Sequence, residues 1–308
     1  MDAKAKIGIT ADSSSAIEYA PFKNNIKITR TYINFGNQHL LDGEDIKAQA
    51  FYKMLEKTDV IPTTSAPTTG EILKRLDEWN ENGATDVIHF AISSGLSKYG
   101  LHIKSIIDET KEVNTNFYVF DSGTACLSEG YNAKYAEVLA EKGYSVKDIL
   151  TECEHFRLNT MTYFMVGDLK YLVKNGRLSA TGGAIAGLMK IKPILKLGLD
   201  GLIVPFKKVR TNKKAMDKLF DITVEQGHGH KRCVYCVHHS DRLDDAIILR
   251  NRIKETVHNA VRIDLTDVTP TIGAHIGPHL LGTTIIVLDD LKENFELEDK
   301  CDYPYKGM

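Results

Sequence analysis

Short apolar segments alternate with amphipathic segments through the first half of this sequence, and this alternation limits the fold more than any other feature. The predicted strands, compact runs of β-branched and aromatic residues, are 6–10, 26–35, 86–92 and 116–120. The predicted helices, with apolar residues at helical spacing, are 48–55, 70–80, 100–111, 129–141 and 146–158. Strands that alternate with helices favour a parallel sheet covered by helices on both faces.

The second half of the chain predicts a mixed sheet, because a hairpin occurs among its strand–helix units. Asp200-Gly201 is typical of a tight turn between two strands, 194–197 and 202–206. The other predicted strands are 161–166, 231–239, 261–265 and 283–288, and the predicted helices are 211–225 and 241–257. We therefore expect an α/β fold with two domains, a parallel-sheet domain over 1–158 and a mixed-sheet domain over 159–308, with the ligand between them. The tail 289–302 is expected to be a solvated acidic extension.

The composition excludes several classes of protein. Hydrophobic residues make up 43% of the 308 residues and charged residues 26%, which is typical of a folded globular chain. The net charge of -2 argues against a nucleic-acid partner, because such proteins carry a basic surplus. No segment approaches the roughly 18 apolar residues of a membrane span, so no integral membrane segment is expected. The five cysteines and the polar start, which lacks a signal peptide, predict a reduced, cytoplasmic protein.

Three clusters of hydroxyl residues follow predicted strands or precede predicted helices. They are Asp12–Ser15, Thr63–Thr68 and Ser93–Ser97. In an open α/β sheet this edge is the usual ligand crevice, and hydroxyls beside free backbone N–H groups bind small anions. Helix capping explains any single cluster, but three clusters at one edge favour an anion or carboxylate site.

Two of these clusters, with several later segments, match the motifs of one family in the family's order. Thr64–Thr68 is similar to a T-S-x-P-S motif, and Ile92–Ser97 is similar to I-S-S-G-L-S. Further similarity lies in 121–122, 172–179, 189–194 and 273–278. Through these segments, which span nearly the whole chain, the sequence resembles the DegV family of fatty-acid-binding proteins.

The resemblance implies a carrier that holds a single long-chain fatty acid and is not itself an enzyme, so we expect no catalytic residue, no metal and no cofactor. Such a carrier presents the carboxylate to a separate ATP-dependent kinase subunit, which converts it to an acyl phosphate. Thr64 and Ser97 match the family's carboxylate-binding hydroxyls, and Ser65 and Ser94 stand beside them.

The resemblance also implies a group of residues that face the kinase and the phosphorylated product. Arg177, Arg210 and His275 match this group. Arg177 is expected in a turn, and His275 in a loop, where its imidazole would add a pH dependence near neutrality. Lys98 and His279 depart from the family pattern, which reads S-G-T and G-P-G at these places, and both lie near the expected carboxylate and partner sites.

A glycine-rich apolar segment, 182–189, is expected to line the acyl tunnel. Ile185, Leu188 and Met189 are its candidate pocket residues, although an ordinary core helix explains each of them equally well. Burying about fourteen methylenes would contribute about 11 kcal/mol before the cost of immobilising the ligand.

Other functions have weaker support. Cys233 and Cys236 have the spacing of metal ligands, but in a strand they would point to opposite faces, and no second pair exists. No nucleotide-binding loop of the G-x-x-x-x-G-K-[ST] type occurs. One alternative is a lipid chaperone or sensor without a kinase. A less favoured one is a serine acyl hydrolase, for which Ser97 has no recognisable base and the G-x-S-x-G elbow is missing.

Overall fold

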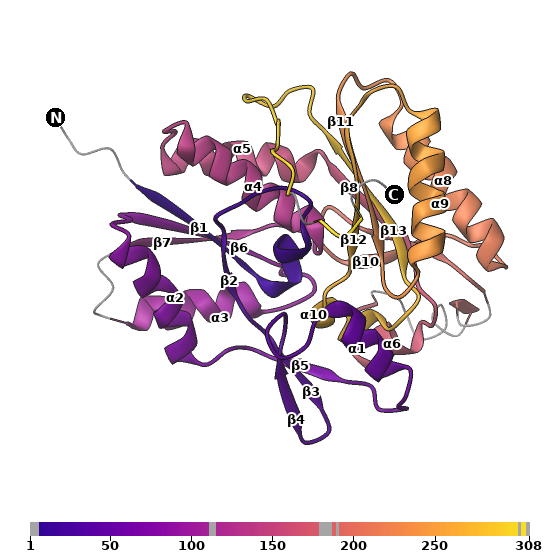
Figure 1. The fold of residues 1–308 in the computed structure, drawn as a ribbon, viewed down its shortest axis with the longest axis horizontal. Helices are drawn as coiled ribbons and strands as arrows, with labels where there is room; N and C mark the ends of the chain where they lie inside the picture. The colour runs from indigo at the N-terminus through magenta and orange to yellow at the C-terminus, as the bar shows by residue number, and fades with distance from the viewer. Residues whose placement is uncertain (1–5, 111–114, 179–186, 189–190, 301–302, 306–308) are drawn as a thin grey trace.

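Two β-sheets, one from each half of the chain, form most of the fold (Figure 1). The computed structural model describes residues 6–110, 115–178, 187–188, 191–300 and 303–305. The first sheet is parallel, with the strand order β2 (Lys27–Thr29), β1 (Ile7–Asp12), β6 (Asp86–Ala91) and β7 (Asn116–Asp121). Its parallel strands bring their carboxyl ends to one edge, where polar segments follow β1 and β6.

Helices cover both faces of this parallel sheet. They are α2 (Thr69–Glu81), α3 (Tyr99–Glu109), α4 (Leu127–Glu141) and α5 (Val146–Leu158). Val87 of β6 packs with Ile103 of α3 on one face, whereas Phe90 packs with Tyr131 of α4 and Phe156 of α5 on the other. Successive strand residues point to opposite faces, so every residue of β6 is buried.

The second sheet is mixed. Its strand order is β10 (Ile203–Lys207), β9 (Ile194–Leu197), β8 (Thr160–Met165), β13 (Leu281–Val287), β11 (Cys233–His239) and β12 (Ala260–Asp267). Only β11 and β12 pair in parallel among these neighbouring strands in the described residues. The helices α8 (Asn212–Gly227) and α9 (Leu243–Thr256) cover its outer face (Figure 1), and α4 meets its inner face, where Val234 and Ile286 share a cluster with Tyr131.

The predicted fold class is confirmed, with a parallel sheet in the N-terminal half and a mixed sheet in the C-terminal half. The predicted helix 211–225 corresponds to α8, which Thr211 caps by accepting the N–H of Lys214 with its side chain. The domain boundary after residue 158 stays a prediction. None of the helices in the described part of the chain has the length and apolar character needed to cross a membrane.

The single strand predicted over 26–35 is wrong, because the segment forms two strands in different sheets. β3 (Tyr32–Phe35) joins β4 (Gln38–Leu41) and β5 (Thr63–Ser65) in a separate antiparallel sheet, and α1 (Ala48–Leu55) precedes β5. Between β2 and β3, the side chain of Arg30 donates to the carbonyl of Asp42 at 2.7 Å, and the N–H of Thr31 donates to Ser13 Oγ at 3.2 Å. These long-range bonds separate two segments that both have strand-forming composition.

The acidic segment after β13 packs on the protein and is not the solvated extension predicted from its composition. Phe295 is 1% exposed, and its ring contacts those of Tyr135 and Phe156. An antiparallel bridge also pairs Phe22 with Asp299. The last part of the chain therefore completes the apolar core of the first half, because the aromatic area that Phe295 buries outweighs the charge around it.

The two cysteines with metal-ligand spacing lie on opposite faces of β11. Cys233 packs in the cluster beneath α8 and α9, and Cys236 packs in the cluster beneath α4. The two thiols therefore share no site. No group of three or more His, Cys, Asp or Glu side chains that could hold a metal ion occurs in the described residues.

Candidate functional site

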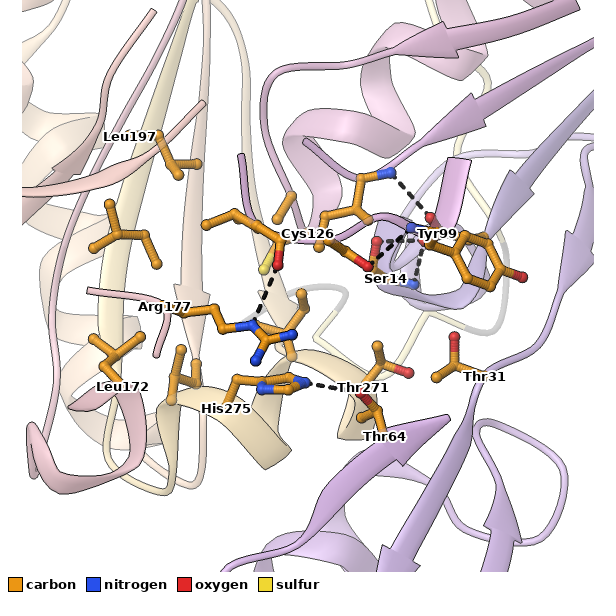
Figure 2. Close-up of a pocket in the computed structure, with 18 of the residues that line it drawn as sticks. Ser14, Thr31, Thr64, Tyr99, Cys126, Leu172, Arg177, Leu197, Thr271 and His275 are labelled. Atoms are coloured by element: carbon orange, nitrogen blue, oxygen red, sulfur yellow. Dashed lines mark hydrogen bonds between the residues drawn. The ribbon is translucent and has the colours of Figure 1, made fainter. Parts of the chain in front are cut away.

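A cavity of about 320 Å³ lies between the carboxyl edge of the parallel sheet and the mixed sheet (Figure 2). Its walls combine segments that are far apart in sequence. Asp12 comes from the end of β1, Thr64 from β5, Phe164 from β8, and His275 from the short helix α10 (Pro270–Ile276). This position agrees with the general rule that ligands of open α/β sheets bind at the carboxyl ends of the strands.

One end of the cavity is apolar. Figure 2 places Leu172 of α6 (Lys170–Lys174) and Leu197 of β9 on the side opposite Thr31 and Thr64. Other apolar lining residues are Phe164, Ile203 and Leu280. This end has the character of a site for a hydrocarbon chain.

Of the three predicted tunnel residues, the structure describes Leu188. Leu188 is 3% exposed and belongs to the same apolar cluster as Leu172, but it is not among the residues that line the cavity. Ile185 and Met189 lie outside the described residues. Their place in an acyl tunnel therefore stays a prediction.

The opposite end of the cavity is lined by hydroxyl groups. They belong to Ser14, Thr31, Thr64, Ser65, Ser97 and Thr271. Four of these residues, Ser14, Thr64, Ser65 and Ser97, come from the three hydroxyl clusters that the sequence analysis identified at this edge. A hydroxyl is both a donor and an acceptor, so this end suits a polar head group without adding a formal charge.

The loop that carries Ser97 is bonded to the end of β1 and to the β9–β10 hairpin. Asp12 Oδ2 accepts the N–H of Ile92 at 2.9 Å, and Ser93 Oγ donates to the carbonyl of Gly201 at 2.9 Å. The second bond joins the loop to the β9–β10 hairpin, and Gly95 lies so close to it that a Cβ there would be 2.9 Å from the Gly201 backbone. These contacts hold the loop in place between the two sheets.

A buried pair of carboxyl groups supports Ser14 beneath the cavity. Glu129 Oε2 accepts from Ser14 Oγ at 2.8 Å, and Asp12 Oδ1 accepts from the N–H of Ser14 at 2.8 Å. Burial is the main cause that raises the pKa of both carboxyl groups, and that of Glu129 is raised furthest. Two buried negative charges so close together would repel each other, which favours a shared proton in this pair.

His275 and Arg177 lie next to each other in the cavity wall. His275 Nε2 is 2.9 Å from Thr64 Oγ1, and Nδ1 has no hydrogen-bond partner among the described residues. Arg177 Nε donates to the carbonyl of Leu96 at 3.2 Å, and its Nη1 donates to the carbonyl of Asn175. No carboxylate in the described part of the chain forms an ion pair with Arg177, so its charge is available to an anion in the cavity.

Two predictions about His275 are wrong. It lies in α10 and not in a loop, because Thr269 caps the helix by accepting the N–H of Ile272 and Pro270 begins its first turn. It also does not titrate near neutrality, since burial, and next the charge of Arg177, lower the pKa of His275 to about 4. The imidazole is therefore neutral at pH 7.

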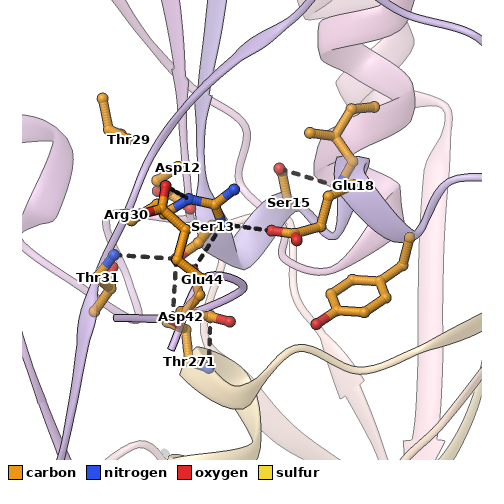
Figure 3. Close-up of polar contacts among 12 residues, drawn as sticks. Asp12, Ser13, Ser15, Glu18, Thr29, Arg30, Thr31, Asp42, Glu44 and Thr271 are labelled. Carbon is orange, nitrogen blue, oxygen red and sulfur yellow. Dashed lines mark hydrogen bonds and ion pairs between the residues drawn. The ribbon is translucent and has the colours of Figure 1, made fainter. Parts of the chain in front are cut away.

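A buried carboxyl group connects the hydroxyl end of the cavity to the three-stranded sheet (Figure 3). Asp42 Oδ2 accepts the N–H of Thr271 at 3.0 Å and its hydroxyl at 2.5 Å. Thr271 Oγ1 also lies 3.1 Å from Ser13 Oγ. Burial is the main cause that raises the pKa of Asp42 to about 7. This network connects α10, which carries His275, to the sheet that carries Thr64.

The structure does not bring every predicted site residue to the cavity. Ser94 is exposed and does not line the cavity, and its buried neighbour Ser93 does not line it either, because the Ser93 hydroxyl donates to the carbonyl of Gly201. Arg210 is exposed and also lies outside the lining. Lys98 lines the cavity from an exposed position, whereas His279 lies outside it and takes the glycine-favoured φ of 65° where the family pattern has glycine.

Three residues that the sequence analysis missed line the cavity or support its wall. Thr271 and His238 line it, and Asp42 binds Thr271. Asp42 is 229 positions from Thr271, so no local pattern connects them. The alternation of β11 was the one available signal for His238, because Cys236 and His238 share a face.

Comparison with known proteins identifies the family. Residues 6–288 match the model of the DegV family, which is described as uncharacterised. A DegV domain-containing protein of Staphylococcus aureus (strain COL) is 29% identical over 279 residues, 90% of this chain and 96% of the relative. Protein DegV of Bacillus subtilis (strain 168) is 29% identical over 278 residues, 90% of this chain and 97% of the relative.

Solved structures share the fold. The structure of DegV from Bacillus subtilis, described as a fatty acid binding protein, has a TM-score of 0.80 at 27% identity and covers 92% of this chain and 99% of its own. A fatty acid binding DegV family protein from Streptococcus agalactiae has a TM-score of 0.82 at 24% identity, with coverage of 92% and 99%. Since the family model matches from the first described strand through the last, this chain belongs to the DegV family.

Proposed function

We propose that this protein binds one long-chain fatty acid in the cavity, with the acyl chain at the apolar end and the carboxylate at the hydroxyl end. The observation that carries this proposal is a single cavity in which Leu172 and Leu197 lie opposite Thr31 and Thr64. Each methylene that leaves water contributes about 0.8 kcal/mol, so the chain supplies most of the affinity. The solved relative from Bacillus subtilis is itself described as a fatty acid binding protein.

In this proposal Thr64 and Ser97 donate hydrogen bonds to the carboxylate, and Ser65 lines the same end. Ser94 leaves the proposed set, because its side chain is exposed outside the cavity. Neutral donors orient a carboxylate and leave it more nucleophilic than a direct ion pair would. Arg177 binds backbone carbonyls through Nε and Nη1 and lies within reach of an added anion.

We further propose that the bound carboxylate is presented in the cytoplasm to a separate ATP-dependent kinase subunit, which forms the acyl phosphate. Arg177 and His275 line the cavity, where phosphoryl oxygens would arrive, and a cation there would stabilise the growing negative charge. Arg210 is exposed outside the cavity and would act on the partner's surface. The protein itself contributes binding and orientation, not the phosphoryl donor.

The alternatives have less support in the geometry. A serine hydrolase needs a base beside its nucleophile, but Ser97 Oγ accepts only the N–H of Tyr99, at 3.2 Å, among the bonds of the described residues. Thr64 does contact His275, yet among the described residues no acidic side chain bonds to Nδ1 of that ring to orient it. A lipid sensor without a kinase fits the same cavity and is separated from the carrier only by experiment.

The deciding experiment is native mass spectrometry of the purified protein, followed by lipid extraction. One co-purified fatty acid per chain supports the binding proposal, and a chain that neither carries nor takes up a fatty acid refutes it. Acyl-phosphate formation with ATP and a kinase subunit then tests presentation. Arg177→Ala, Arg210→Ala and His275→Ala should bind fatty acid nearly normally and form acyl phosphate more slowly. Normal turnover in all three would favour the sensor.

A further inference from the structure

A basic face lies where β10 ends and α8 begins. Its five cations stand within eight residues that include no acidic residue, and all five are exposed: Lys207, Lys208, Arg210, Lys213 and Lys214. The whole chain has a net charge of -2, so the rest of it carries -7 and the basic face stands out against an acidic protein. Such a local reversal of sign attracts negatively charged partners to one place on the surface.

The charge of the basic face is not neutralised within the described part of the chain. No described carboxylate forms an ion pair with any of its five side chains. Asp217 follows Lys213 by one turn of α8, but it pairs with Arg252 of α9 at 2.9 Å. The next acidic residue of the helix, Asp221, lies 3.9 Å from Lys218. The five cations are therefore available to a partner.

Two of these lysines lie where a helix disfavours positive charge. Lys213 and Lys214 are in the first turn of α8, directly after the cap, and this turn contains no acidic residue. The free N–H groups of a first turn carry a partial positive charge, so cations there are unfavourable and anions are favourable. The helix α5, by contrast, has Asp148 in its first turn. An acidic partner that covered the start of α8 would replace this repulsion with attraction.

The character of the basic face favours a protein partner over a membrane or a nucleic acid. No large apolar side chain that could insert into lipid is exposed within 207–214. The charge of -7 on the rest of the chain would be repelled by a broad polyanion, whereas a compact acidic patch meets the basic face alone. The half-buried ring of Phe206 lies between Lys196 and Lys207, with its centroid 5.3 Å and 5.1 Å from their Nζ atoms. Aromatic side chains of this kind are enriched in protein interfaces.

We propose that the basic face is the surface on which the kinase subunit docks, through an acidic patch of that subunit. The inference rests on the proposed function and deepens it, because it gives the partner's surface its charge and extends the contact from Arg210 to the start of α8. β10 connects the two sites, since Ile203 lines the cavity and Lys207 belongs to the basic face. Pro205 has no N–H to donate at this edge of the sheet, so side chains and not strand pairing hold the partner.

The test measures kcat and the apparent KM of the kinase subunit for the fatty-acid-bound protein in acyl-phosphate formation. For Lys213→Glu combined with Lys214→Glu we expect KM to rise at least about tenfold at an ionic strength of about 0.01 M. The difference should shrink at about 0.15 M, where the Debye length is about 8 Å instead of about 30 Å. Both kcat and fatty-acid affinity should stay unchanged, because neither lysine lines the cavity.

The same double variant should have a higher melting temperature than the wild type, because glutamates suit the first turn of a helix. A rise in KM therefore cannot come from unfolding. Lys147→Glu is the matched control for Lys213→Glu alone. Lys147 is exposed and is the second residue after the cap of α5, as Lys213 is in α8. Lys213→Glu should raise KM, and Lys147→Glu should leave it at the wild-type value.

The outcomes separate this inference from the proposed function. If the double variant keeps the wild-type KM at low ionic strength, the inference is refuted, while fatty-acid binding and presentation stand. An equal rise of KM in Lys147→Glu would assign the effect to net charge and also refute it. If the double variant instead loses binding to phosphatidylglycerol vesicles and keeps its KM, the basic face meets a membrane and the inference is wrong. If the wild type forms no acyl phosphate with the kinase subunit, presentation fails and this inference fails with it, while mass spectrometry still decides fatty-acid binding.

Discussion

Replacing Thr64 with valine tests the hydroxyl end of the cavity and retains the β-branched shape that suits strand β5. Thr64 Oγ1 lies 2.9 Å from Nε2 of His275, whose imidazole is neutral because its pKa is lowered to about 4. The ring can therefore donate to Thr64 and leave the hydroxyl proton for the carboxylate. A hydrogen bond to a charged group contributes roughly 1.5–3 kcal/mol, so Thr64→Val should weaken binding about 10- to 150-fold.

The assay is a titration with a fluorescent long-chain fatty acid, run beside thermal unfolding of each variant. Ser94→Ala is the matched control, since it removes a hydroxyl from an exposed residue outside the cavity and should bind normally. Adding Ser97→Ala to Thr64→Val should weaken binding further. The reasoning is refuted if Thr64→Val unfolds normally and binds within about twofold of the wild type, a change too small for a lost charged hydrogen bond.

Three further predictions concern other parts of the site. Arg177→Met should raise the pKa of His275, because the charge of Arg177 lowers it, whereas Arg210→Met should leave it unchanged. NMR titration of the imidazole measures this pKa, and the same value in both variants would contradict the prediction. Asp42→Asn should change how the free energy of unfolding depends on pH. The pKa of Asp42 is about 7 in the folded protein and 3.8 in the unfolded chain, so the folded state holds this proton more tightly. The contribution of Asp42 to the free energy of unfolding therefore falls as the pH rises from about 4 to 7 and is constant above pH 7. Urea unfolding at about pH 5 and pH 8 should show the difference between variant and wild type changing by on the order of 3 kcal/mol, and a pH-independent difference would count against a buried Asp42. Leu197→Trp should fill the apolar end and weaken long-chain acids more than about tenfold while short-chain acids bind as before, measured by competitive displacement; equal losses for both would place the acyl chain elsewhere.

The sequence predicted the local elements well where one periodicity was strong. The strand at β6 and the helices α2 and α8 appear where apolar spacing placed them, because such segments bury one face or both. Thr64, Ser97, Arg177 and His275 all line the cavity, and the roles that the family resemblance implied for them stay predictions.

The parts that could not be predicted depend on contacts between distant residues. The break between β2 and β3 depends on bonds from Arg30 and Thr31 to other segments, and composition does not record such bonds. The pKa of His275 depends on how deeply α10 is buried, which the flanking glycines do not reveal. The acidic residues around Phe295 gave no sign that its ring is buried, although one buried aromatic side chain can hold such a segment against the core.

The position of Phe295 has a consequence for how the chain is made. Residues up to 158 leave the ribosome first, and at about 5–20 residues per second the segment that carries Phe295 follows on the order of ten seconds later. Throughout this interval the aromatic surface of Tyr135 and Phe156 lacks its cover. The nascent first half therefore exposes this aromatic surface until the segment with Phe295 has been made, and a chain that terminates after β13 should depend on chaperones to stay in solution.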